Sequence, residues 1–131
     1  MDVVITQWGL DSYLELKHGA VFSADEYWST IRPNVLLLRD YPAPTEFSNN
    51  KFWSPAGAAN GLISDGFKMK WHQVGPGRVQ LRLPIGLIGQ AYLCGAYVKD
   101  DPKAERRRLA KFKTHLTLIR EGNFHVYGRL T

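Results

Sequence analysis

Hydrophobic and polar residues alternate strictly over residues 66–84, in two runs that a Gly-Pro-Gly sequence separates. A period of two is typical of strands that bury one face. The stretch is therefore predicted to form a β-hairpin with a three-residue loop, Gly75 to Gly77, because that loop length places apolar residues opposite apolar ones. The apolar positions are Phe67, Met69, Trp71, Val79, Leu81 and Leu83. In the predicted register Trp71 faces Leu81, Met69 faces Leu83 and Lys70 faces Arg82.

The polar face of this hairpin carries positive charge only. Its residues are Lys68, Lys70, His72, Arg78 and Arg82, and no acid occurs from residue 66 to residue 99. A solvent-exposed strand face, on which lysine is common, is one interpretation. A surface that contacts phosphate groups is the other, and the single sign of charge favours it.

The N-terminal part of the chain predicts one strand followed by helices. Residues 3–6 form a β-branched run that is typical of a strand, and residues 11–17 predict a short helix that Gly19 ends. Ser23, with Glu26 three residues later, has the capping-box pattern of a second helix start.

This second helical pattern continues over residues 24–39. A break is expected near Arg32, because Pro33 removes a backbone hydrogen bond. Residues 40–61 then have the least regular pattern and predict a loop. The aromatic residues in this loop, Phe47, Phe52 and Trp53, either anchor it to the body of the protein or stack on nucleic-acid bases.

Residues 90–98 are almost all apolar and predict a central strand that is covered on both faces. Asp101 and Pro102 then mark the start of a long helix that runs to Arg120, with Gly122 just past its end. Its apolar stripe consists of Leu109, Phe112, Leu116 and Ile119. Residues 123–130 alternate again and predict a last strand.

The first half of the long helix is strongly basic, because six cations and one acid occur in residues 103–113. A solvated helix face and a surface for nucleic acid or for a partner protein are both open interpretations. The cations are Lys103, Arg106, Arg107, Arg108, Lys111 and Lys113.

Together these elements predict one α+β domain over residues 1–131, with a mainly antiparallel twisted sheet and helices from both ends of the chain packed on it. A net charge of +5 suggests a polyanionic partner: nucleic acid, an acidic protein or an anionic membrane surface. The single cysteine, Cys94, gives neither a disulfide nor a metal-binding spacing, and no cofactor or metal is expected. Signal-peptide and membrane-spanning patterns are not recognised, so a cytoplasmic location is predicted.

The chain resembles the RelE/ParE superfamily of bacterial toxin–antitoxin systems over residues 63–115. The resemblance lies in Gly-Phe-Lys-Met-Lys-Trp at 66–71, Gly-Arg-Val-Gln-Leu at 77–81, and Ala-Tyr-Val-Lys at 96–99 before a basic helix. RelE-type nucleases carry a Lys-x-Lys strand, an arginine beyond the turn and a cation after the next strand, and Lys68, Lys70, Arg78 and Lys99 match in order. The chain departs from the family in its 40–61 segment, in its C-terminal tail, and in having no tyrosine or histidine over residues 105–111.

The resemblance implies a toxin that inhibits translation by cutting mRNA, either free or on the ribosome, and that a cognate antitoxin protein neutralises. The antitoxin is expected to present an acidic or amphipathic segment to the basic sheet or helix. The candidate catalytic residues are Lys68, Lys70, His72, Arg78 and Lys99. The candidate RNA-binding residues are Gln80, Arg82, Arg106, Arg107 and Lys111.

Within this hypothesis Lys68 or Lys70 is a candidate base, Arg78 and Arg82 are expected to hold the phosphate, and His72 titrates near neutral pH. Two other functions stay open. ParE-type members share the fold and inhibit DNA gyrase without cleavage, and a nucleic-acid-binding module would use the basic face only to position a backbone.

Overall fold

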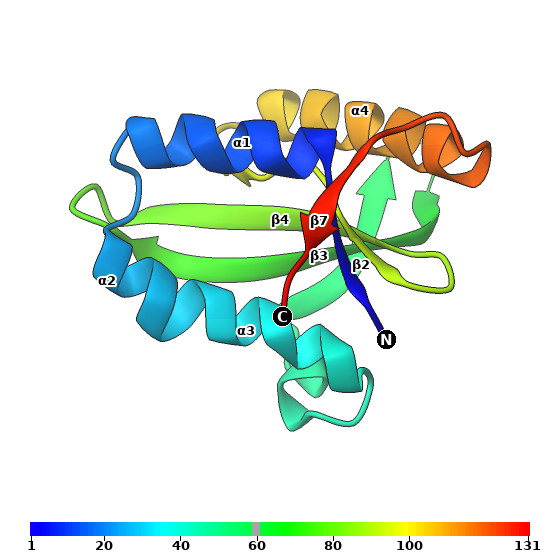
Figure 1. The fold of residues 1–131 in the computed structure, drawn as a ribbon. Coiled ribbons are helices and arrows are strands. Elements are labelled where there is room, and N and C mark those ends of the chain that lie inside the picture. The colour runs from blue at the N-terminus through cyan, green and yellow to red at the C-terminus, as the bar shows by residue number, and fades with distance from the viewer. Residues whose placement is uncertain (59–60) are drawn as a thin grey trace.

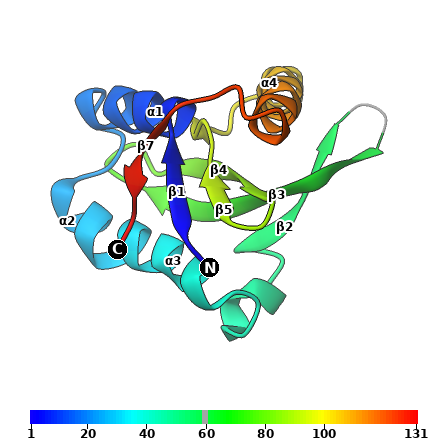
Figure 2. The same cartoon turned by 45° about the vertical axis from the view of Figure 1, so that its right-hand side comes forward.

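The computed structural model describes residues 1–58 and 61–131 and has an α+β fold. A mixed, mostly antiparallel sheet of seven strands lies between helices (Figures 1 and 2). Its order is β2-β3-β4-β5-β1-β7, β6 also pairs with β4, and the β1–β5 pair is parallel. The strands are β1 (Val3–Thr6), β2 (Trp53–Ala58), β3 (Gly61–Val74), β4 (Val79–Leu87), β5 (Ala91–Leu93), β6 (Tyr97–Val98) and β7 (Val126–Arg129). The main helices are α1 (Gln7–His18), α2 (Ala24–Glu26), α3 (Arg32–Leu36) and α4 (Pro102–Arg120).

The predicted hairpin is formed by β3 and β4, and its central register is confirmed. Lys70 pairs with Arg82 and Trp71 with Leu81. The three-residue loop is wrong, because Val74 pairs with Val79 and leaves four residues in the turn. A bulge after Trp71 adds one residue to β3, and Gln73 takes a left-handed φ of 57° there. Because β3 has one residue more than β4 between these pairs, the turn is one residue longer than predicted. The apolar and polar faces of the hairpin stay as predicted at its centre.

Helix α1 starts earlier than the sequence pattern predicts. The Thr6 hydroxyl at the end of β1 accepts a hydrogen bond from the Gly9 amide at 3.2 Å and caps the helix, which begins at Gln7, four residues before Asp11. Gly9 also lies against the backbone of β5, where an added Cβ would be 2.5 Å from the Leu93 carbonyl oxygen. The tight contact holds the start of α1 against β5.

The second helical segment has the predicted capping box and the predicted break. Ser23 and Glu26 exchange both hydrogen bonds, each at 3.0 Å. Residues 27–31 then form a π-helical turn directly before α3, and Pro33 occupies the first turn of α3. A wider turn at this position accommodates the missing proline N–H, which explains why helical structure continues to Asp40.

Glu26 also ties the tip of the β3–β4 hairpin to this helix, because its Oε2 accepts the Gly75 amide at 2.9 Å. The backbone hydrogen bonds from Ser23 and Gly75 lower the pKa of Glu26 below its ordinary value. A carboxyl whose pKa is lowered by folding stabilises the fold above its unfolded pKa, and this contribution is lost as the pH falls through the folded value.

The Glu26→Gln variant should therefore lose less thermal stability than the wild type when the pH is lowered from about 6 to about 3. Melting temperatures measured across this range by circular dichroism check the expectation, with Asp25→Asn, at an exposed neighbouring position, as the control. Parallel pH profiles for wild type and Glu26→Gln would contradict it.

The predicted loop over residues 40–61 contains a strand that the sequence pattern does not reveal. Residues 53–58 form β2 and pair with β3. Residues 59–60, which belong to the predicted loop, lie outside the described part of the chain. Trp53 is 5% exposed and stacks on Phe67 with ring centroids 5.0 Å apart. Phe47 and Phe52 pack against the same core, so the anchoring role of these aromatics is confirmed.

The single strand predicted over residues 90–98 is divided into β5 and β6. Both pair with β4, but the register shifts by one residue between them. Pro84 of β4 lies at this point and has no N–H to donate to the neighbouring strand. Cys94, in the interruption, is fully buried, and burial raises the pKa of its thiol to about 12.

Helix α4 forms as predicted and covers one face of the sheet, whereas α2, α3 and the helical turns around them cover the other (Figure 2). Gly66 and Gly86 allow the close approach of α4, because added Cβ atoms would lie 2.9 Å from Phe112 and 2.4 Å from Leu116. The predicted last strand is shortened to β7, which pairs with β1, and Val126 on it is 48% exposed.

Candidate functional site

A row of three polar side chains crosses the sheet face on which α4 lies. Lys70 on β3 pairs with Arg82 on β4, which pairs in turn with Tyr97 on β6. Directly opposite residues have Cβ atoms about 5 Å apart. Lys68 lies two positions along β3 on the same face. Strand register therefore gathers residues that are up to 29 positions apart in the chain, counting from 68 to 97.

Glu105, in the first turn of α4, adds a carboxylate to this row. Its Oε2 accepts a hydrogen bond from the Tyr97 hydroxyl at 2.7 Å and lies 3.9 Å from the Lys68 Nζ. The side chains of Lys68 and Glu105 are each 16% exposed. We call Lys68, Lys70, Arg82, Tyr97 and Glu105 the sheet–helix cluster.

Burial and neighbouring cations make both lysines weaker bases than ordinary lysines. Burial is the main cause that lowers the pKa of Lys68, and Arg82 and Lys99 lower it further while Glu105 opposes them. The pKa of Lys70 is lowered by burial and then by the charges of Lys68, Arg82 and Lys99. A lysine in this state gives up a proton more readily than one in water.

Tyr97 shows the opposite behaviour. Its side chain is 2% exposed, and burial together with the hydrogen bond to Glu105 raises its pKa far above the ordinary value. The hydroxyl therefore stays protonated and fixes the direction of the Glu105 carboxylate.

Arg82 is the buried cation of the cluster. The residue is 4% exposed, its Nη2 donates to Gln80 Oε1 at 2.6 Å, and its Nη1 donates to the Leu81 carbonyl at 3.2 Å. These bonds hold the guanidinium in place under the lysines. Any anion bound at the cluster would meet the two ammonium groups first.

Two predicted site residues lie toward the turn of the hairpin and away from Glu105. Arg78 is exposed in the turn with a φ of 50°, and four residues separate it from Arg82, about 13 Å along a strand. His72 is exposed at the bulge, where its Nε2 donates to the Lys51 carbonyl at 2.8 Å. The structure does not bring either residue to the cluster.

The remaining predicted cations are exposed at the surface. Lys99 is exposed just after β6, and its charge acts on both lysines. Arg106, Arg107 and Lys111 are exposed on α4. Arg108, which the sequence reasoning did not select, acts electrostatically on Tyr97.

Sequence reasoning also missed Glu105 and Tyr97, the two residues that complete the cluster. One signal for Glu105 was present, since it is the single acid among six cations in residues 103–113. Its direction toward the sheet depends on how α4 docks. That docking combines the buried apolar stripe of α4 with the close approach that Gly66 and Gly86 of the distant sheet allow.

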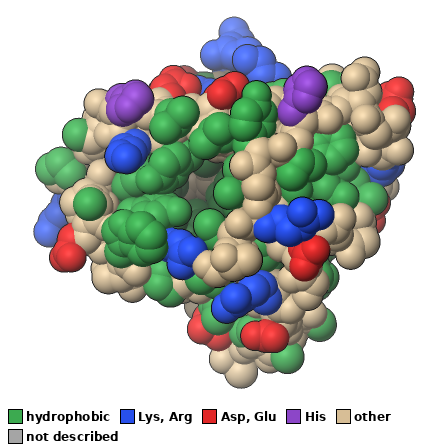
Figure 3. Space-filling view, viewed as in Figure 1, with side chains coloured by type: hydrophobic (Ala, Val, Ile, Leu, Met, Phe, Trp, Pro, Cys, Tyr) green, Lys and Arg blue, Asp and Glu red, His purple; other side chains and the backbone are tan. Residues whose placement is uncertain are grey.

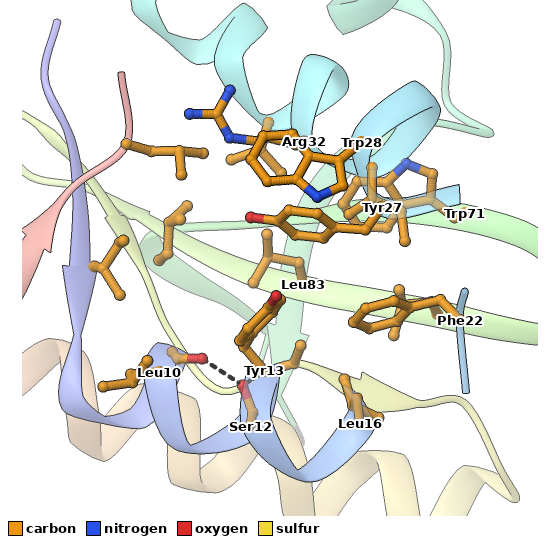
Figure 4. Close-up of a pocket in the computed structure, with 18 residues that line it drawn as sticks. Leu10, Ser12, Tyr13, Leu16, Phe22, Tyr27, Trp28, Arg32, Trp71 and Leu83 are labelled. Atoms are coloured by element: carbon orange, nitrogen blue, oxygen red, sulfur yellow. Dashed lines mark hydrogen bonds between the residues drawn. The ribbon is translucent and has the colours of Figure 1, made fainter. Parts of the chain in front are cut away.

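A separate cavity lies away from the cluster, between α1, the 27–36 helical segment and the sheet. It has a volume of about 260 Å³ and a mainly apolar lining that includes Tyr13, Tyr27 and Leu83 (Figure 4). Figure 3 shows it as a hollow surrounded by hydrophobic side chains. Trp28 at its edge is 63% exposed and lies under the Arg32 guanidinium, 5.0 Å from ring centroid to Cζ.

Comparisons with protein-family models, with curated proteins and with solved structures find no significant match to this chain. In residues 1–58 and 61–131, no group of three or more His, Cys, Asp and Glu side chains is arranged to hold a metal ion. No helix of this described part is long and apolar enough to cross a bilayer.

The sheet–helix cluster combines three chemical abilities. Its cations attract an anion, its carboxylate can accept a proton, and its lysines can donate one. The arrangement is suited to a phosphodiester, in which negative charge must be stabilised while one oxygen loses a proton and another gains one.

Proposed function

We propose that the protein is an endoribonuclease toxin of the RelE type, with the sheet–helix cluster as its active site. The observation that carries the proposal is the contact of Glu105 with both Lys68 and Tyr97 beside Lys70 and Arg82. A carboxylate among buried and half-buried cations can act as a base while the cations stabilise the charge that develops on a phosphate.

In the proposed reaction Lys68 and Lys70 bind the scissile phosphate, and the deeper Arg82 adds to their field. Glu105 takes the proton of the ribose 2′-hydroxyl, and the 2′-oxygen attacks the phosphorus. The P–O5′ bond breaks, and the leaving 5′-oxygen takes a proton from the Lys70 ammonium, whose pKa is lowered. The products are a 2′,3′-cyclic phosphate and a 5′-hydroxyl, and solvent returns the two residues to their starting protonation states.

The antitoxin proposed for this protein would carry an acidic, amphipathic segment. Acidic side chains complement the exposed cations Lys99, Arg106 and Arg107, and apolar side chains fit the cavity beside Trp28. The two surfaces lie on different parts of the molecule, so a partner that uses both must wrap around it.

The Glu105→Gln variant is expected to cleave RNA about 10²- to 10³-fold more slowly than the wild type, because it lacks the base. RNA binding should not weaken, because the substitution removes a negative charge beside the phosphate. Glu121→Gln, at the exposed end of α4, is the matched control and should cleave like the wild type. Cleavage is measured on programmed ribosomes in Mg²⁺-containing buffer and on free mRNA in the presence of EDTA, and it is followed by mapping the new 5′ ends.

The same variants are then induced in bacterial cells. The wild type should stop growth and shorten mRNA, Glu105→Gln should do neither, and coexpression of the neighbouring antitoxin gene should restore growth. Growth arrest with intact mRNA and a DNA-damage response would replace the proposal by a gyrase inhibitor. RNA binding without cleavage by any variant would leave a nucleic-acid-binding module.

A further inference from the structure

Helix α4 continues beyond the sheet–helix cluster with a face that carries cations and an aromatic ring. Arg108, Phe112 and His115 follow Glu105 at helical spacing, so their side chains lie on one side of the helix. Ten residues separate Glu105 from His115, about 15 Å along the axis. No acid follows Glu105 in α4. An anionic chain that leaves the cluster along this side meets no repulsive charge from the helix itself.

A small hollow opens on this side, between α4 and the backbone that joins β5 to β6. Its lining consists of Gly95, Arg108, Lys111, Phe112 and His115. The volume of about 60 Å³ corresponds to about four water positions. A phosphate group, which has four oxygens, is of comparable size. Two exposed cations at its edge match an anionic occupant.

A pair of stacked rings borders the same hollow. The His115 imidazole lies parallel to the Trp8 indole of α1, with ring centroids 3.9 Å apart and planes 8° from parallel. Burial, and then the charge of Lys111, lower the pKa of His115, so its ring is neutral at neutral pH. Flat aromatic rings beside cations are the arrangement by which proteins bind single-stranded nucleic acid.

We propose that this region is a subsite for single-stranded RNA next to the cleavage centre. Arg108 and Lys111 hold a phosphate in the hollow, and the adjoining base stacks on the Trp8–His115 pair. Arg108 and Lys111 follow Glu105 by about 5 and 9 Å along the helix axis, which corresponds to about one to three phosphate spacings of a stacked strand. Arg108 connects the two regions, because its charge acts on Tyr97 in the cluster. This proposal depends on the proposed function in one respect only, which is that the scissile phosphate lies at the sheet–helix cluster.

The test measures binding of a fluorescent RNA hexamer in which every 2′-hydroxyl is methylated, so that no cleavage occurs. Arg108→Ala and Lys111→Ala should each weaken binding at least about fivefold and lower the slope of log K against log salt by about 0.7. Lys113→Ala is the matched control: it removes one exposed cation from another side of α4 and should change affinity less than twofold. With a dinucleotide, which is too short to reach from the cluster to the hollow, binding should be weak and the three variants alike.

Replacement of His115 separates stacking from charge. His115→Phe keeps a flat ring against Trp8 and should bind the hexamer like the wild type, whereas His115→Ala should bind at least about fivefold more weakly. Thermal melting shows that each variant is folded before it is used. Equal binding by the Lys111→Ala and Lys113→Ala variants, or no binding of the hexamer by the wild type, overturns the subsite. Normal cleavage by Glu105→Gln together with the predicted salt slopes would overturn the proposed active site and leave the subsite standing.

Discussion

Replacing Lys68 by methionine is expected to slow RNA cleavage about 10²- to 10³-fold while the protein stays folded. The ammonium group lies 3.9 Å from Glu105 among cations that the sheet register fixes, so the charge it would offer to a phosphate is preorganised. Methionine keeps the apolar stem that packs in the half-buried site and removes only the charge. The quantity measured is the single-turnover rate of RNA cleavage at a saturating protein concentration.

Lys113→Met is the control for this experiment, because it removes an exposed cation of α4 without touching the cluster. Its rate should stay within about threefold of the wild type, because water and salt screen the charge of an exposed cation. A Lys68→Met rate as high as that of Lys113→Met would remove Lys68 from the proposed active site.

The Gly75→Ala variant is expected to lose about 3 kcal/mol of the free energy of unfolding. Gly75 has a φ of +68°, which strains any residue with a Cβ, and the added atom would lie 1.9 Å from the Val21 carbonyl oxygen. Neither backbone segment can move without breaking the Gly75 N–H bond to Glu26. Urea unfolding followed by tryptophan fluorescence gives the midpoint and the slope.

Gly77→Ala provides a control in the same turn. Its added Cβ would be 3.4 Å from the end of the Val79 side chain, and its cost should stay below about 1 kcal/mol. Similar losses in the two variants would show that the turn, and not its contact with the loop before α2, limits stability.

The elements with a strong local signal were predictable from the sequence. The caps at Ser23 and Asp101 are both observed, and the strict alternation of residues 66–84 gave the pairs at the centre of the hairpin. The division near Pro33 was also expected, although its form as a π-helical turn was not. In each case the cause lies within a few residues of its effect.

The features that were missed depend on contacts between distant parts of the chain. Strand β2 contains Pro55 and Gly57, which disfavour strands locally, and it forms because β3 offers a pairing edge. Glu105 belongs to the candidate site only because α4 docks on two glycines of the sheet. The predicted Arg78 was placed with the lysines by alternation and by the family resemblance, and the four-residue turn carries it away.

The position of β1 in the sheet has a consequence for the order in which the newly made chain can fold. β1 leaves the ribosome early, yet its partners are β5 and β7, so Val3 pairs with Ala91 and Val4 with Arg129. The β3–β4 hairpin joins neighbouring segments and can form as soon as both have emerged. The sheet, by contrast, closes only after residue 129 has left the exit tunnel. Lys68 and Lys70 on β3 are therefore synthesised long before the fold that positions them is complete.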